Sequence, residues 1–176
     1  LYIFQSLSDF ATAPDLDFTK AMLFFRKSST SLNPNDDSFN IKISLGLCYL
    51  KQKAFNLALT HFAKLIDEFP EQPKPYIYKV LALLAGKKPR ISNMKTIQEI
   101  KGILNMAHAL GESNGQALAL LAVIEYDYFT SNGLKLQNPS PHELIQTARD
   151  EGMSFDELLA SIELIGLSED DVEELI

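Results

Sequence analysis

Apolar residues recur at intervals of three and four along most of the chain, and this spacing places them on one face of a helix. In the predicted helix over residues 116–130, apolar residues occupy almost every side as far as Ile124. We therefore expect neighbouring elements on every side of that helix. No segment has a convincing strand pattern. The pattern predicts an all-α fold with helices over residues 1–10, 15–29, 39–51, 55–67, 76–85, 93–109 and 116–130.

Helix-start signals recur near the C-terminus. A serine followed three residues later by an acidic residue is the pattern of a capping box, in which the two side chains bond each other's backbone N–H groups. We therefore expect an acidic C-terminal segment, residues 139–176, of short helices packed on the rest of the chain. The three pairs are Ser140 with Glu143, Ser154 with Glu157 and Ser168 with Asp171.

Two consecutive helices have small residues where they would touch. Gly46 on the first and Ala58 on the second would let the helices approach closely, and Tyr49 and Phe62 would fill the space beside them. Pro70 cannot continue the second helix, because it has no amide proton and disfavours a helical conformation of the residue before it. The sequence therefore predicts an antiparallel helix pair that comes closest at Gly46 and Ala58.

The intervals between these five residues resemble those of the tetratricopeptide repeat (TPR) family, whose unit is a helix–turn–helix of about 34 residues. Lys42 stands where the family often has a large aromatic residue. The resemblance implies a TPR-like right-handed superhelix of antiparallel helix pairs over residues 1–138, followed by a C-terminal group of short helices. It is strong over residues 39–70, degenerate over 1–36 and 73–130, and does not cover 140–176.

The resemblance also implies a groove, lined by the first helix of each pair, that receives a peptide or helix of another protein. One subset of the family binds a carboxylate there through Lys and Asn. In this chain Ile43 and Leu47 occupy positions where that subset has Lys and Asn in its first repeat. If residues 39–70 correspond to the second repeat, Ser44 occupies the position of its Asn. We therefore expect an apolar or mixed groove. Alternatively, these residues pack on a neighbouring helix. The implied groove residues are Asn40, Ile43, Ser44, Leu47, Leu50, Lys51, Lys74, Ile77 and Tyr78.

Charge divides the chain unequally. Of the net charge of −7, residues 150–176 contribute −10, from ten acidic and no basic residues; the other 149 residues carry 16 basic and 13 acidic groups, or +3. A basic cluster between Lys87 and Lys101 is too sparse, in an acidic chain, to favour nucleic-acid binding. The apolar runs are too short to span a membrane. A single cysteine, Cys48, favours a reducing compartment, so we expect a cytoplasmic protein.

No catalytic or metal-binding constellation is visible. His61, His108 and His142 lie far apart in the sequence without a nearby second ligand, and are expected to have surface or packing roles. The sequence has two pairs of adjacent carboxylates. Asp36 and Asp37 fit a turn, and Asp170 and Asp171 fit a capping position. We therefore expect no cofactor, no metal and no enzymatic activity.

Two hypotheses of function follow. The first is a non-catalytic scaffold or adaptor that binds a peptide or helix of a partner protein in the groove. The alternative is a regulatory or sensing region of a larger multidomain enzyme, whose acidic C-terminal tail docks in cis on the basic cluster. It is motivated by a chain that starts without Met and stops inside an apparent helix, as a fragment would. Self-association stays open.

Overall fold

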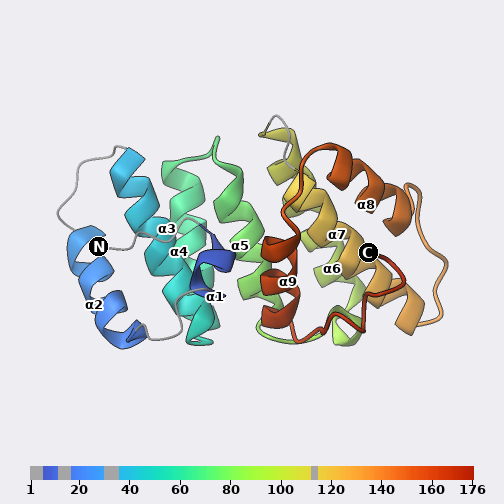
Figure 1. Cartoon of the computed structure of the whole chain (residues 1–176), viewed down its shortest axis with the longest axis horizontal. Coiled ribbons are helices and arrows are strands. Elements are labelled where there is room, and N and C mark those ends of the chain that lie inside the picture. Colours follow the sequence, from blue (N-terminus) through green and yellow to red (C-terminus); the bar gives the residue numbers. More distant parts are fainter. Residues whose placement is uncertain (1–5, 12–16, 30–35, 112–114) are drawn as a thin grey trace.

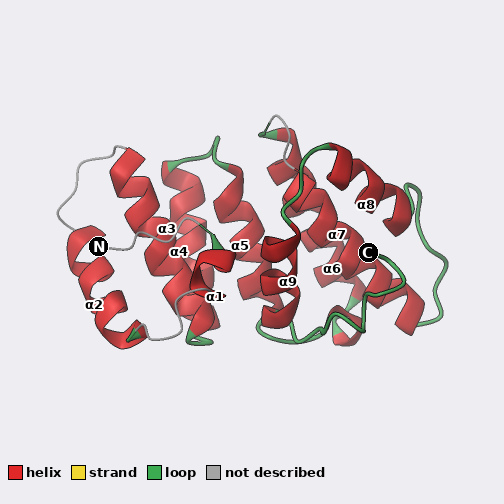
Figure 2. Ribbon diagram, viewed as in Figure 1, coloured by secondary structure: helices red, strands yellow, loops and turns green. Residues whose placement is uncertain are grey.

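The computed structural model describes residues 6–11, 17–29, 36–111 and 115–176 (Figure 1). This part of the chain is all-helical and contains no strand, which confirms the predicted fold class at that level (Figure 2). Its helices are α1 (Leu7–Ala11), α2 (Phe18–Ser29), α3 (Asp36–Lys51), α4 (Phe55–Glu68), α5 (Pro73–Leu84), the 3-10 turn η1 (Pro89–Ile91), α6 (Met94–Ala109), α7 (Gly115–Ser131), α8 (Pro141–Asp150) and α9 (Phe155–Leu164).

The helices from α2 to α8 stand side by side, and each packs against the next one along the chain (Figure 1). Helix α3 also contacts α5, so alternate helices meet as well as consecutive ones in this part. Helices α1 and α9 depart from that order, because they contact each other although they lie near opposite ends of the chain. Helix α9 also packs on α7.

Prolines mark the end of α4 and the start of α5. Helix α4 ends at Glu68, and Phe69 has φ −134° and ψ 65°, which is outside the helical region as its position before Pro70 requires. Helix α5 begins at Pro73, three residues earlier than the predicted start at Tyr76. Proline is tolerated there, because the first N–H groups of a helix have no intrahelical partner.

The contact between α3 and α4 depends on glycine. A Cβ atom on Gly46 would lie 2.4 Å from Cζ of Phe62 and 3.0 Å from Cδ2 of His61, both on α4. Phe62 and Ala58 are fully buried, so the ring cannot turn out into solvent without losing its packing. The predicted close approach is therefore present at Gly46, where the nearest atoms of α4 belong to Phe62 and His61, while the predicted contact of Gly46 with Ala58 stays a prediction.

Helix α7 is buried on nearly every side, as its apolar sequence predicted. It contacts α6, α8, α9 and η1. Two buried acidic residues on this helix have basic partners: Glu125 lies 2.7 Å from Nζ of Lys101, and Asp127 accepts hydrogen bonds from the backbone N–H and Nε of Arg90. These pairs offset the desolvation of the two carboxylates.

The C-terminal segment follows its predicted start signals only in part. Ser140 and Glu143 form a complete capping box at α8. The prediction of a third helix, starting at Ser168, is wrong. After Ser168 the chain forms successive turns up to Leu175. The Asp171 carboxylate accepts a hydrogen bond from the Ser168 N–H at 2.9 Å, as in a capping box. It also accepts hydrogen bonds from Lys88 and Arg90. A local pattern cannot report such distant partners.

Candidate functional site

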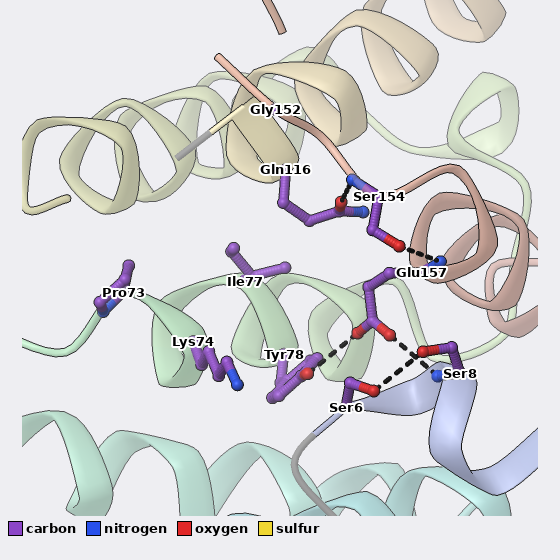
Figure 3. A pocket seen from close by; sticks show the side chains of 10 residues that line it. All are labelled: Ser6, Ser8, Pro73, Lys74, Ile77, Tyr78, Gln116, Gly152, Ser154 and Glu157. Carbon is purple, nitrogen blue, oxygen red and sulfur yellow. Dashed lines mark hydrogen bonds between the residues drawn. The ribbon is translucent and has the colours of Figure 1, made fainter. Parts of the chain in front are cut away.

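The carboxylate of Glu157 lies where α1, α5 and α9 meet. Its Oε1 accepts hydrogen bonds from the Leu7 backbone N–H at 3.1 Å and from the Tyr78 hydroxyl at 2.9 Å. Its Oε2 accepts from the Ser8 backbone N–H at 2.9 Å. Figure 3 shows the carboxylate between Tyr78 and the start of α1. One side chain therefore joins three helices.

The start of α9 explains why this carboxylate is available. Ser154 caps the helix through its side chain, which accepts from the Glu157 backbone N–H at 3.3 Å. In a complete capping box the Glu157 carboxylate would return to the Ser154 N–H. Here that N–H donates to Oε1 of Gln116 on α7 at 3.2 Å. The predicted capping box is thus half formed, and the Glu157 carboxylate reaches α1.

Burial makes these hydrogen bonds important. The Glu157 side chain is almost buried, and the three donors bonded to it are uncharged. A buried carboxyl group without partners would be strongly unfavourable, and these donors replace the hydrogen bonds to water that Glu157 loses on burial. Burial raises the pKa of the Tyr78 hydroxyl well above its ordinary value, and the adjacent negative charge of Glu157 adds to this rise. Tyr78 therefore remains a donor at all physiological pH values.

A pocket of about 380 Å³ opens beside Glu157. Figure 3 shows the lining residues, which come from α1 and its preceding residue, from α5, from α7, and from the connection between α8 and α9 and the start of α9. Its walls mix apolar side chains, hydroxyl groups, an amide and an ammonium group. The lining residues are Ser6, Ser8, Pro73, Lys74, Ile77, Tyr78, Gln116, Gly152, Ser154 and Glu157.

The structure separates the nine residues implied as a groove into two groups. Those on α3 are mostly covered: Ile43, Ser44, Leu47 and Leu50 are buried, while Asn40 and Lys51 are half-buried. Those on α5, namely Lys74, Ile77 and Tyr78, line the pocket, and Lys74 is exposed. The alternative of packing on a neighbouring helix thus describes the buried α3 residues. Their role in partner binding stays a prediction.

A second polar cluster holds the C-terminal turns. Nζ of Lys88 lies 3.0 Å from both carboxylate oxygens of Asp171, and a terminal nitrogen of Arg90 lies 2.8 Å from one of them. The hydrogen bond from the Ser168 N–H, followed by those from Lys88 and Arg90, holds the pKa of Asp171 well below its ordinary value. Arg90 bridges Asp171 to the buried Asp127.

Each of the three histidines contacts a neighbouring group, and the cysteine is buried. Nε2 of His61 donates a hydrogen bond to the Lys42 carbonyl at 2.7 Å, and burial lowers the pKa of the His61 ring. His108 bonds Glu151 at 2.8 Å, and the His142 ring packs edge-on against Tyr126. Cys48 is buried, which raises the pKa of its thiol to about 12 and makes the thiolate scarce at neutral pH.

Two negative findings apply to the described residues. No group of three or more His, Cys, Asp or Glu side chains among them is placed to hold a metal ion. None of the helices formed by these residues is both long and apolar enough to cross a membrane. Comparison with known proteins also found no family model, no curated protein and no solved structure that matches the chain.

Sequence reasoning missed the contact between α1 and Glu157. It assigned Glu157 to a local capping box and treated Leu7 only as part of an N-terminal helix. The signal in the sequence was ambiguous, because a serine-to-glutamate spacing is the same whether the carboxylate returns to its own helix or reaches another. The two partners are 150 residues apart in the chain.

Proposed function

We propose that the chain is a non-catalytic module that binds a peptide or helix of another protein in the pocket beside Glu157. The observation that carries the proposal is the pocket itself, because Lys74, Ile77 and Tyr78 of the implied groove line it. The same surface already holds a helix of this chain, α1, against α9.

The finer architecture belongs to the same proposal. We propose that α3 and α4, with the helices that follow them, form a TPR-like right-handed superhelix. Contacts between consecutive helices, together with the contact between α3 and α5, are the pattern expected when helix pairs stack. The glycine contact of Gly46 with Phe62 supports the assignment at the best-matching unit.

Charge reversal in the pocket tests the function. Peptides selected by display on the folded protein would be labelled and titrated, with binding followed by fluorescence anisotropy. Lys74→Glu should weaken their binding about tenfold, or ~1.4 kcal/mol, because this exposed ammonium group lines the pocket. Lys95→Glu is the matched control, since Lys95 is also an exposed helical lysine and lies outside the pocket lining. Equal binding by both variants, or failure to select any peptide, would contradict the proposal.

One observation favours the second candidate, a regulatory region of a larger enzyme with its acidic tail docked in cis. Asp171 contacts Lys88 and Arg90, so the acidic segment meets the basic cluster. This candidate predicts that Asp171→Asn changes partner affinity more at low salt than at high salt, because salt screens partly exposed ion pairs.

A further inference from the structure

Helix α1 depends on its surroundings for its conformation. It has five residues, and an isolated helix of that length is not stable in water. Leu7, its first residue, is fully buried in the core although the helix lies at the molecular surface. The N–H groups of Leu7 and Ser8, which have no partner within the helix, both donate to Glu157.

The residue before α1 completes its capping. The Ser6 side chain accepts from the Asp9 N–H at 3.4 Å, and the Ser6 N–H donates to Oδ2 of Asp9 at 3.1 Å. This reciprocal pair has the geometry of a capping box. The Asp9 N–H therefore has its acceptor within the first turn of α1, whereas the N–H groups of Leu7 and Ser8 donate to Glu157. The positive end of the helix also faces a negative carboxylate.

We propose that the seat of α1, formed by Tyr78, Glu157 and the buried space that Leu7 fills, accepts the first turn of a partner helix in place of α1. The proposal rests on the proposed function and names the partner's chemistry. Helix α1 is then an intramolecular competitor for the seat, and a partner helix binds by displacing it.

The contacts specify what such a partner must carry. It needs a capping residue such as Ser, Thr, Asp or Asn, followed by a leucine-sized apolar residue that enters the core. Both the first and the second helical positions must supply an N–H to Glu157. Proline is common at the first position of helices in general, but here it would leave the carboxylate short of a donor. Exclusion of proline from these two positions is therefore a distinctive requirement.

The competition can be measured in the full chain. Ser8→Pro removes one N–H donor from α1 and leaves Tyr78 and Glu157 unchanged; proline is tolerated within the first turn of a helix. The probe is an acetylated fluorescent peptide with the sequence of residues 5–17. It should bind the Ser8→Pro protein at least tenfold more tightly than the wild type, where the tethered α1 competes at an effective concentration near the millimolar range.

Two controls test the seat itself. A peptide with proline in place of Ser8 should bind the Ser8→Pro protein at least tenfold more weakly than the original peptide. Tyr78→Phe, which removes only the hydroxyl donor to Glu157, and Glu157→Gln should each change peptide affinity in the Ser8→Pro background, with circular dichroism verifying that the helices remain folded. Equal peptide binding by wild type and Ser8→Pro, or equal binding of the two peptides, would overturn the proposal.

Other outcomes separate this inference from the proposed function. A foreign peptide selected on the wild type that does not compete with the α1 peptide would overturn the inference and leave the proposed function standing. Binding of the α1 peptide without any selectable foreign peptide would support the seat while the proposed function fails. A wild-type dimer that Ser8→Pro abolishes would show that a second copy supplies the helix, which overturns the proposal of a separate partner.

Discussion

Glycine at position 46 is required by the buried ring of Phe62, which lies where a side chain would have to go. The sequence indicated this contact because a small residue at one helical spacing and an aromatic residue at another are a local, readable pattern. Glu157 shows the limit of the same reasoning. Its spacing from Ser154 predicted a capping box, but the N–H of Ser154 found a different acceptor on α7.

Adding a side chain at residue 46 should destabilise the fold. In Gly46→Ala the new Cβ would overlap Cζ of Phe62 at 2.4 Å, and overpacking of this kind costs about 1–3 kcal/mol. Gly102→Ala on α6 is the matched control, because no atom beyond the adjacent backbone of its own helix lies within 4 Å of its Cβ position; removing a helical glycine there should stabilise by up to about 1 kcal/mol. Urea unfolding measures both. A Gly46→Ala protein as stable as the wild type would contradict the described packing.

At the scale of elements, helix positions were predictable to within a few residues. The three- and four-residue spacing and the capping residues are properties of neighbouring residues, so α3, α4, α6 and α7 lie close to their expected bounds. The turns after Ser168 were mispredicted as a helix. Their conformation is tied to Lys88 and Arg90 on a distant part of the chain, and no local pattern contains that information.

Asp171 should stabilise the C-terminal turns in its charged form. Asp171→Asn should lower the free energy of unfolding by about 1–2 kcal/mol at neutral pH, because it removes the negative charge that Lys88 and Arg90 contact. The loss is no larger because these two basic side chains are partly exposed, which weakens the ion pairs. The exposed neighbour provides the control, Asp170→Asn, with an expected change within about 0.5 kcal/mol. Urea titrations give both values.

The pH dependence of this contribution has a definite sign. Folding lowers the pKa of Asp171 below the ordinary value of 3.8, so its stabilisation is complete above that pH and is lost as the pH falls toward the folded-state pKa. The difference between wild type and Asp171→Asn should therefore shrink on acidification below about pH 3.8. A difference that stayed constant into acid would show that the carboxylate charge is not responsible.

At the scale of the whole molecule, two helices that are far apart in the sequence pack together. Helices α1 and α9 meet at Glu157, and α5 supplies Tyr78 to the same contact. Most implied groove residues of α3 are buried, and so are Ile77 and Tyr78 of α5, but the α5 residues border the pocket, where Lys74 is exposed. Neither outcome follows from periodicity, because a repeat pattern specifies which face of a helix is apolar and leaves open which part of the chain covers it.

Hydrogen exchange at the start of α1 tests the central claim most directly. If Glu157 holds α1 in its seat, the amide protons of Leu7 and Ser8 should be protected in the wild type. In Glu157→Gln they should exchange at least tenfold faster, while the Glu143 amide in the α8 cap keeps its rate. NMR resolves these amides individually. Unprotected Leu7 and Ser8 amides in the wild type, or rates unchanged by Glu157→Gln, would contradict the account.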